Sequence, residues 1–465
     1  MPDDSFDVIV IGAGPAGENA AGRCAEGGLS VAIVERELVG GECSYWGCMP
    51  SKALLRPGDA VAAARRVPGA AEAVTGPIDV SAALAWRDSI AGDWDDSGQL
   101  PWLEERKIAL VRGTGRLAGE KVVEVEERDG TVRRLTAERA VIVATGTKPV
   151  VPPIEGLADA RPWDNRSVTA AKDIPRRLLV LGGGAIGAEM AQAMRRLGSD
   201  EVTVVEGMNR LLAKEEPFAG EEVKEAFEAE GIRVITGAKM TAVDRPAGAE
   251  RLQATLEDGT VIEADEILVA VGRRPATADL GLDTVGLEPG KPIDVDDRLQ
   301  AKGVAGGWLY AVGDCNGLSL LTHIGKYQAR IAGDVILGKD ARDRASRDIV
   351  PRVTFTDPQV CAVGLTEAQA RDRGLNVKVV DHPTGRVAGG NVTAKDFKGT
   401  SRLVVDEDRR VIVGATFTGA GTADLLHSAT VAIAGEVTLD RLWHAVPSFP
   451  TLSEVWLRLL ESYGL

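Results

Sequence analysis

The chain has 465 residues, too many for one compact core, so we expect two or three domains. A hydrophobic content of 44% is typical of a globular protein, while the net charge of −15 excludes the positive field that nucleic acid and anionic membranes require. Because we find no bilayer-spanning apolar run and no signal-peptide core, we expect a cytoplasmic protein.

The first predicted element is a buried strand at 6–11 that leads directly into a glycine turn. Gly12 permits the tight turn, Gly14 lets a pyrophosphate approach the backbone, and Gly17 lets the following helix pack on the strand. A second strand then ends at Glu35, whose carboxylate is placed to accept the ribose hydroxyls. This order of elements predicts a dinucleotide-binding unit.

Two cysteines, Cys43 and Cys48, follow this unit at the predicted start of a helix. They can close into a local disulfide, and a helix N-terminus stabilises thiolate, so we expect a lowered thiol pKa and redox activity. A zinc site is the alternative, but no second Cys or His pair follows at ligand spacing, so we expect no metal. The distant Cys24, Cys315 and Cys361 are expected to be packed or loop thiols.

The same order of elements recurs further along the chain, after a helical stretch near 52–98 and short strands between 108 and 143. Its second copy consists of a strand, a glycine turn, a helix and a strand that ends at Glu206, and the turn contains Gly182, Gly184 and Gly187. Two complete copies indicate two bound dinucleotides rather than two empty turns.

Glu206 bears on the choice of nicotinamide cofactor, because a carboxylate there repels the 2′-phosphate of NADPH. Arg210 lies nearby and is either a phosphate ligand or one half of a surface ion pair. We therefore favour NADH over NADPH.

After another set of short strands at 232–269, the C-terminal part is expected to form a separate α+β domain. Its predicted strands lie near 351–356, 376–380, 402–406 and 411–417, and its helices near 366–373, 422–435 and 451–462.

The cysteine motif, which runs from Gly40 to Lys52, resembles the active-site signature of the pyridine nucleotide–disulfide oxidoreductases, such as lipoamide dehydrogenase, glutathione reductase and mercuric reductase. The resemblance covers nearly the whole chain. It is supported, in the family's order, by the segments Ala144-Thr145-Gly146, Gly187-Ala188-Glu189, Gly272-Arg273-Arg274-Pro275, Tyr310-Ala311-Val312-Gly313-Asp314 and Phe355-Thr356-Asp357-Pro358-Gln359-Val360.

This resemblance implies an α/β fold with two Rossmann-like dinucleotide-binding domains, for FAD and NAD, and a C-terminal α+β dimerisation domain. The implied boundaries are 1–150 with 279–345 for a discontinuous FAD domain, 151–278 for the NAD(P) domain and 346–465 for the interface domain. It also implies a homodimer whose active site is completed by the partner's C-terminal domain.

Residue roles follow from the same resemblance. Cys48 would be the charge-transfer thiol beside the flavin, Cys43 the exposed interchange thiol, and Lys52 the partner of Glu189 near the flavin N5. His323 would either contact the flavin ring or only cap its helix. The other implied FAD-site residues are Gly12, Gly14, Gly17, Glu35, Gly41, Gly115, Thr145, Gly146 and Asp314. The implied NAD-site residues are Gly182, Gly184, Gly187, Glu206 and Gly272.

The sequence departs from the family at the proton-transfer site. Most disulfide-reducing members carry a His-Pro segment followed by Glu, and the partner subunit contributes that His as the acid/base. Here Phe449 occupies the His position, while Glu454 remains. Phenylalanine cannot transfer protons, so water, Glu454 or His444, which we place on the preceding helix, would have to do so.

The bulky Tyr45 and Trp46 between the cysteines either narrow access to Cys43, stack on an aromatic acceptor or pack against the other subunit. Mercuric reductases share Phe-Pro but carry a C-terminal cysteine pair, and this sequence ends Glu461-Ser462-Tyr463-Gly464-Leu465, so we do not expect mercury reduction.

The sequence therefore predicts an FAD-dependent NAD(P)H oxidoreductase that passes electrons through Cys43 and Cys48 to a small disulfide. The alternatives are a diaphorase-like reductase of quinones, metal ions or other acceptors directly at the flavin, and a non-catalytic redox-sensing flavoprotein.

Overall fold

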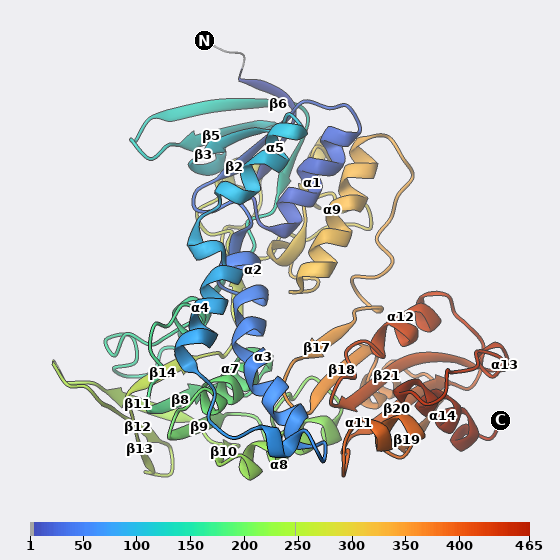
Figure 1. Ribbon diagram of the computed structural model, residues 1–465. Helices are drawn as coiled ribbons and strands as arrows, with labels where there is room; N and C mark the ends of the chain where they lie inside the picture. Colours follow the sequence, from blue (N-terminus) through green and yellow to red (C-terminus); the bar gives the residue numbers. More distant parts are fainter. Residues whose placement is uncertain (1–3, 247) are drawn as a thin grey trace. The chain divides into compact units, whose positions relative to one another are not determined.

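The structure is a computed structural model that describes residues 4–246 and 248–465. Its contacts divide the chain into two compact units, each assembled from three segments (Figure 1). The first comprises Met1–Pro50, Asp88–Pro149 and Gly272–Arg347, and the second comprises Ser51–Arg87, Val150–Val271 and Asp348–Leu465. The boundaries of the three expected domains stay a prediction.

The first unit is built on a sheet with the strand order β3-β2-β1-β6-β5-β4, in which β16 also pairs with β6. The strands are β1 (Ser5–Ile11), β2 (Val31–Glu35), β3 (Ala109–Arg112), β4 (Thr114–Leu117), β5 (Val122–Glu126), β6 (Val132–Val143) and β16 (Leu309–Ala311). The strands β1, β2, β3 and β16 run parallel to their neighbours, so the apolar run of β1 is buried on both faces.

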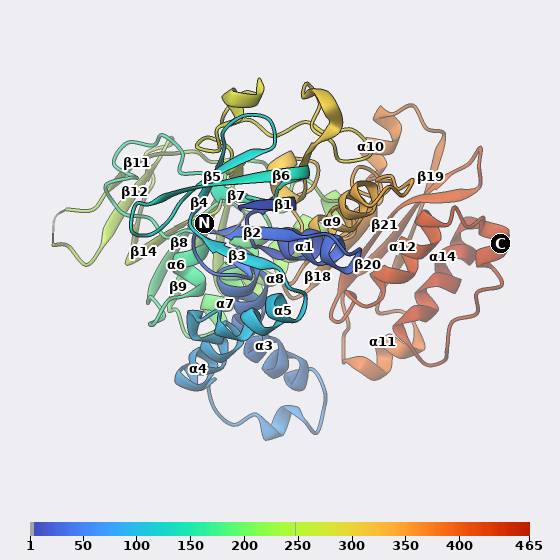
Figure 2. The same cartoon turned by 90° about the horizontal axis from the view of Figure 1, so that it is seen from above.

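Two long helices of this unit, α1 (Pro15–Glu26) and α9 (Thr322–Ile336), pack side by side, as both views show (Figures 1 and 2). A short ribbon formed by β7 (Thr147–Pro149) and β15 (Arg273–Pro275) adds a further antiparallel pair. The start of α9 at Thr322 places His323 at the beginning of a helix, where the sequence placed it.

The second unit contains the second copy of the strand, glycine turn, helix and strand. Its parallel sheet has the order β10-β9-β8-β14, and a separate antiparallel sheet has the order β11-β12-β13. The bounds are β8 (Arg177–Leu181), α7 (Ala185–Arg196), β9 (Glu201–Glu206), α8 (Pro217–Ala229), β10 (Ile232–Thr236), β11 (Met240–Asp244), β12 (Leu252–Leu256), β13 (Val261–Ala264) and β14 (Glu266–Val269).

The two glycine turns have the same geometry. A Cβ at Gly17 would lie 1.8 Å from the carbonyl oxygen of Gly12, and a Cβ at Gly187 would lie 1.9 Å from that of Gly182. Gly12 and Gly182 themselves have φ of +102° and +110°, which favour glycine. Close helix–strand packing therefore requires glycine at equivalent places in both copies.

The helical segment α3 (Cys48–Arg65) begins in the first unit and continues in the second, where Leu54 and Leu55 join the apolar core around α7. The second unit also contains most of α4 (Val80–Ile90), whose Arg87 is fully buried. Arg87 donates to the carbonyl oxygens of Thr169 and Ala171, which satisfies part of its buried guanidinium.

The C-terminal part of the second unit is an antiparallel sheet with the order β17-β18-β21-β20-β19. Its elements are β17 (Arg352–Thr354), β18 (Gln359–Gly364), α10 (Glu367–Asp372), β19 (Val377–Pro383), α11 (Ala388–Thr393), β20 (Thr400–Asp406), β21 (Val411–Gly419), α12 (Leu426–Ala434), α13 (Leu439–Leu442) and α14 (Val455–Tyr463).

The sequence did not predict β18 and α11. The strand β18 is buried along nearly its whole length, so it lacks the alternation that marks a half-exposed strand. The short helix α11 contains Gly389 and Gly390, poor helix formers that tertiary packing holds in place. Among the described residues, none of the helices has the length and apolar character needed to cross a bilayer.

Candidate functional site

The first glycine turn joins the end of β1 to the N-terminus of α1 and is fixed by Glu35. The two oxygens of this carboxylate accept hydrogen bonds from the backbone N–H groups of Ala13, at 2.8 Å, and Glu37, at 2.7 Å. Burial raises the pKa of Glu35, and these two N–H groups oppose that shift. A Cβ at Gly14 would meet nothing within 4 Å, so the helix N-terminus is open to an anionic group.

A second group of polar residues lies on the loops around β7 and β16. Asp314 accepts a hydrogen bond from the Thr147 hydroxyl at 2.9 Å, and that hydroxyl accepts one from Arg273 at 2.7 Å. Burial raises the pKa of Asp314. The Thr145 hydroxyl oxygen is buried and has no hydrogen-bond partner among the described residues, so it can bind a group outside the chain.

The cysteine motif packs directly on the first glycine turn. The Gly40 N–H donates to the Ala13 carbonyl at 2.8 Å, and a Cβ at Gly41 would lie 2.8 Å from the Cα of Gly14. Glycine at 41 therefore lets the motif approach the turn. Cys43 lies on the short helix α2 (Gly41–Tyr45), and Cys48 is the first residue of α3.

Cys43 and Cys48 are both free thiols and are hydrogen-bonded to each other. The Cys48 sulfur also lies 3.2 Å from the Thr322 hydroxyl at the start of α9. The hydrogen bond with Cys48 and burial raise the pKa of Cys43, whereas Thr322 and Lys326 act in the opposite direction. The expected lowering of the thiol pKa is therefore wrong for Cys43, because a neighbouring sulfur disfavours its negative charge.

Tyr45, between the two cysteines, has a different role from the three that the sequence suggested for it. Tyr45 is buried within the first unit, and its hydroxyl donates to the Val39 carbonyl at 2.9 Å. Its own carbonyl accepts a hydrogen bond from the Trp94 indole at 3.1 Å. Tyr45 thus anchors the motif, while Trp46 beside it is half-buried.

The second glycine turn reproduces the first. The carboxylate of Glu206 accepts hydrogen bonds from the backbone N–H groups of Gly183 and Met208, each at 2.6 Å. A Cβ at Gly184 would meet nothing within 4 Å. Nearby, the Arg210 guanidinium donates to the Ala213 carbonyl at 2.9 Å. It forms no ion pair with any residue that the structure describes, so the surface ion pair suggested for it is not seen there.

Lys52 and Glu189 form an ion pair of 2.7 Å in the second unit, as the sequence suggested. The other oxygen of Glu189 accepts from the backbone N–H of Phe355 at 2.9 Å, and the Lys52 ammonium lies 4.9 Å from the centre of the Phe355 ring. Glu189 is nearly buried, so this pair is held more firmly than a surface salt bridge.

The segment that replaces the family's His-Pro is exposed, with 77% of Phe449 accessible to solvent. Glu454 is buried, and one of its oxygens accepts from the backbone N–H groups of Gly389, at 3.1 Å, and Thr451, at 3.3 Å. His444 lies in an exposed turn after α13, not on a helix as expected, because α13 ends at Leu442.

The remaining predicted residues are also placed. Gly146 and Gly272 have positive φ and open space at the Cβ position, whereas a Cβ at Gly115 on β4 would lie 3.1 Å from the Val34 side chain. His323 is exposed at the second residue of α9. The thiols that we expected to be structural are all buried; they belong to Cys24, Cys315 and Cys361.

Sequence reasoning missed several polar neighbours of these residues. Thr322 and Lys326 act on the cysteine pair, and Thr147 and Arg273 hold Asp314. The only signal was that Arg273 belongs to a recognised motif. No group of three or more His, Cys, Asp or Glu side chains is placed to hold a metal ion in the described part of the chain.

Comparison with known protein families settles the class of the chain. A family model described as pyridine nucleotide-disulphide oxidoreductase matches residues 6–331, and the dimerisation domain of the same family matches residues 350–459. The chain belongs to the pyridine nucleotide-disulphide oxidoreductase family.

Curated relatives agree with this assignment. A dihydrolipoyl dehydrogenase from Thermus scotoductus is 34% identical over 98% of this chain and 97% of its own length. A mercuric reductase from Lysinibacillus sphaericus is 30% identical over 97% of this chain and 81% of its own length. Relatives with different acceptors are thus similarly close.

Solved structures share the fold. LpdA from Mycobacterium tuberculosis has 25% identity and a TM-score of 0.86, and covers 98% of this chain and 100% of its own. The HOCl-induced flavoprotein disulfide reductase RclA from Escherichia coli, solved as a Cu(II) complex, has 24% identity and a TM-score of 0.86, and covers 99% of both chains. The latter likeness concerns the fold alone.

These findings confirm the predicted family and fold class: an α/β protein with FAD- and NAD-binding regions and a C-terminal dimerisation domain. The chain is an oxidoreductase of a flavoprotein family that binds FAD and a pyridine nucleotide. The dimerisation domain supports a homodimer.

Proposed function

We propose that this protein is an NADH-dependent disulfide reductase in which Cys43 and Cys48 carry reducing equivalents from FAD to a small disulfide. The observation that carries this proposal is the unequal environment of the two sulfurs. Cys48 lies at the start of α3, beside the Thr322 hydroxyl, while the pKa of Cys43 is raised by its hydrogen bond to Cys48. The two sulfurs are therefore suited to different roles in thiol–disulfide exchange.

The residues of the first unit are suited to bind FAD. The open N-terminus of α1 at Gly14 suits the pyrophosphate, and the carboxylate of Glu35 suits a ribose. Asp314 and the Thr145 hydroxyl, which has no hydrogen-bond partner among the described residues, suit the polar chain and ring edge of the flavin. When bound, FAD supplies the two-electron chemistry that takes hydride from NADH and reduces the protein disulfide.

The chain's own residues then carry out thiol–disulfide exchange. Cys48 takes the proton of Cys43 across their hydrogen bond, and the Cys43 thiolate attacks one sulfur of the acceptor, which breaks its S–S bond and releases the first thiolate. Cys48 returns its proton to solvent and attacks the Cys43 sulfur, which releases the second thiolate. Two cysteine thiols are oxidised to one disulfide, one acceptor disulfide is reduced to two thiols, and water carries the protons between them.

Asp314 is proposed to bind the ribityl chain of FAD. We expect Asp314→Ala to weaken FAD binding by about tenfold to a hundredfold, since hydrogen bonds to a charged group contribute roughly 1.5–3 kcal/mol. The ratio of flavin to protein absorbance after desalting measures this loss. Asp283→Ala, an exposed change in the same unit, should retain full flavin, and equal retention by both variants would contradict the assignment.

NADH is proposed as the reductant. Glu206 is held by two backbone N–H groups, and Arg210, the nearest cation in sequence, donates to a backbone carbonyl. We expect Glu206→Ala to raise KM for NADH by about tenfold or more, because the ribose loses its hydrogen-bond acceptor. KM for NADPH should change much less, because the substitution also removes the carboxylate that repels the 2′-phosphate. Steady-state kinetics with both cofactors test this, and Glu201→Ala on the same strand is the control. Parallel changes for both cofactors would refute the preference.

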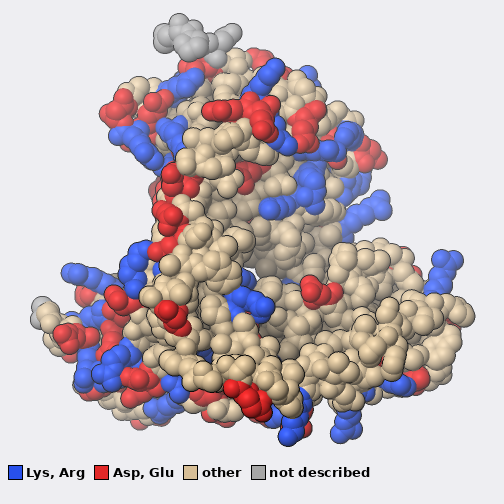
Figure 3. Space-filling view, in the orientation of Figure 1, with Lys and Arg blue, Asp and Glu red and all other residues tan. Residues whose placement is uncertain are grey.

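The homodimer is proposed to complete each active site with the partner's C-terminal domain. The C-terminal part of the chain exposes large apolar side chains. Figure 3 shows few charges there, at the lower right. They include Val392, Val431, Val446 and Phe449.

Acceptor assays test the proposed function as a whole. The purified holoenzyme should oxidise NADH rapidly with disulfides, and Cys43→Ser should remove this activity while leaving quinone reduction. The exposed Phe449 in place of an imidazole favours a second candidate, reduction of quinones directly at the flavin. Disulfide turnover that is negligible beside quinone turnover would decide for that candidate.

A further inference from the structure

Residues 206–216, the cofactor loop, join β9 to α8 and begin with the carboxylate that is proposed to bind NADH. The loop packs on the second glycine turn: a Cβ at Gly183 would lie 2.4 Å from the Leu211 side chain, and the backbone N–H of Leu212 donates to the Gly183 carbonyl at 3.0 Å. On the other side, a Cβ at Gly220 of α8 would lie 2.2 Å from the Leu211 carbonyl oxygen. The loop is therefore held between the glycine turn and α8.

The backbone of the cofactor loop is strained at Leu212. Its φ is +48°, in the left-handed region, where a bulky side chain is rarely found. Arg210 donates to the carbonyl oxygens of Ala213, at 2.9 Å, and Glu215, at 3.4 Å, so the loop also closes on itself. A strained conformation persists only where the surrounding contacts fix it, and such positions are concentrated at functional sites. The contacts at the end of the loop therefore bear on the proposed NADH site.

Two arginines of the dimerisation domain hold the end of the cofactor loop. Arg352, on β17, donates through Nε and Nη2 to the two carboxylate oxygens of Glu215, at 2.9 and 3.0 Å. Arg402, on β20, donates to one oxygen of Glu216 at 3.1 Å, and the backbone N–H of Glu367 donates to the other oxygen at 2.8 Å. Both arginines lie in the part of the chain that matches the dimerisation domain, so this domain contributes to the shape of the loop.

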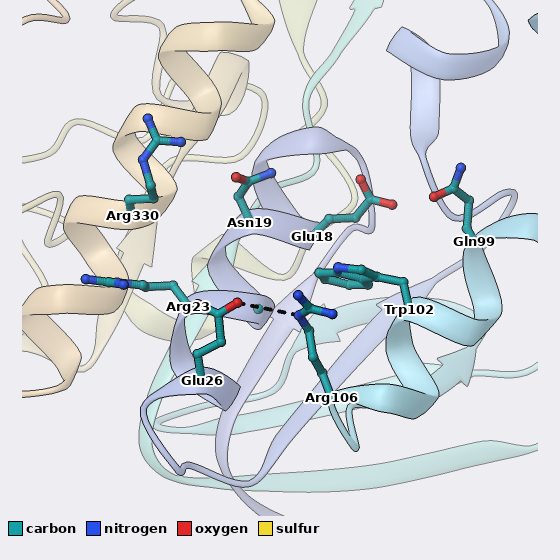
Figure 4. A pocket seen from close by; sticks show the side chains of 9 residues that line it. Glu18, Asn19, Arg23, Glu26, Gln99, Trp102, Arg106 and Arg330 are labelled. Atoms are coloured by element: carbon teal, nitrogen blue, oxygen red, sulfur yellow. Dashed lines mark ion pairs between the residues drawn. The ribbon is translucent and has the colours of Figure 1, made fainter.

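These contacts hold the loop more firmly than an ordinary surface ion pair would. Only 12% of the Glu215 side chain and 2% of the Glu216 side chain are exposed. By comparison, Arg106 in the first unit lies 3.5 Å from Glu26, as Figure 4 shows, and 53% of the Glu26 side chain is exposed. A two-point contact with a nearly buried carboxylate fixes the geometry of both partners, whereas an exposed pair contributes little.

We propose that Arg352 and Arg402 are positioning residues for NADH, because they keep the cofactor loop in the conformation that places the Glu206 carboxylate at the ribose. The inference rests on the proposed NADH site and gives the dimerisation domain a part in binding the reductant. Both arginines act through the carboxylates of Glu215 and Glu216. If a released loop spends about one tenth of its time in the binding conformation, the apparent affinity for the nucleotide falls about tenfold.

Calorimetric titration of the FAD-loaded protein with ADP-ribose tests this inference, because this probe carries the ribose but no nicotinamide that could react with the flavin. We expect Arg352→Met to raise Kd for ADP-ribose and KM for NADH by about tenfold, while kcat stays within about twofold, since only binding depends on the loop. Glu215→Gln and Glu216→Gln remove the charges on the loop side and leave both arginines in place, and they should act in the same direction.

Arg373→Met is the matched control. It removes an exposed ion pair of 2.7 Å with Asp348 from an arginine of the same domain, so it should leave Kd and KM unchanged. The melting temperature and the flavin absorbance of each variant are measured alongside. An equal rise of Kd in Arg373→Met would show a general weakening of the domain and would overturn the positioning role.

The remaining outcomes separate this inference from the proposed NADH site. If Glu206→Ala weakens ADP-ribose binding but Arg352→Met and the two glutamine variants do not, the positioning role is wrong and the site stands. A lower melting temperature with unchanged Kd leads to the same conclusion, because the arginines would then only stabilise the fold. If Glu206→Ala also leaves Kd unchanged, the proposed site itself is wrong.

Discussion

Replacing Cys48 with serine is expected to lower the rate of NADH-dependent disulfide reduction by at least about a thousandfold. A serine hydroxyl at the start of α3 neither carries the negative charge of a thiolate at neutral pH nor forms a disulfide with Cys43. Stopped-flow reduction by NADH measures this directly. The unmodified protein should develop the long-wavelength absorption of a thiolate beside flavin, and Cys48→Ser should not.

Cys43→Ser is the matched control for this result. It should lose disulfide turnover to a similar extent but keep the long-wavelength absorption, because Cys48 retains its contact with the Thr322 hydroxyl. Absorption that is lost in Cys43→Ser and kept in Cys48→Ser would reverse the two assigned roles. Equal disulfide turnover in all three proteins would show that the cysteine pair is not on the route to the acceptor.

Phe449→His is expected to raise kcat/KM for aliphatic disulfides by about a hundredfold, because a positioned acid/base typically contributes that much or more. Without an imidazole, the leaving thiolate must depart unprotonated, so the protein should favour disulfides of acidic aromatic thiols. The ratio of aromatic to aliphatic turnover should therefore be large in the unmodified protein and shrink in Phe449→His. Parallel assays with dithiodipyridine and oxidised lipoamide measure it.

Glu454 makes this prediction specific. The two backbone N–H groups that donate to Glu454 reach the same oxygen of its carboxylate. Among the described residues, its other oxygen therefore remains available to accept a hydrogen bond from a restored imidazole. Phe449→His combined with Glu454→Gln should lose part of the gain, and Phe449→Asn, which is polar but not a base, should gain little. A gain of the same size with asparagine would attribute the effect to access rather than to proton transfer.

Much of the site could be predicted from the sequence because it consists of short-range chain geometry. The turns at Gly12 and Gly182 need positive φ, and Gly17 and Gly187 need close contact within their own turns. The acids that fix these turns come at the ends of the next strands. Such requirements restrict residue type within some 25 positions, so they can be recognised without any tertiary contact.

The raised pKa of Cys43 could not be predicted from short-range chain geometry. Spacing placed Cys43 and Cys48 at a helix start, which suggests an acidic thiol, but the pKa of Cys43 is raised. The residues that act on the pair, Thr322 and Lys326, lie more than 270 positions away and reach it only because α9 packs beside the motif. Their identity carries no local signal.

The sequence by itself determined the two nucleotide units, the redox motif and the loss of the histidine at Phe449, since each depends on residues close together in the chain. Tertiary structure alone decided which side chains surround these groups, such as the buried Tyr45, and which partner Arg210 has. Charge and burial are set by neighbours in space, and packing brings those neighbours from distant parts of the chain.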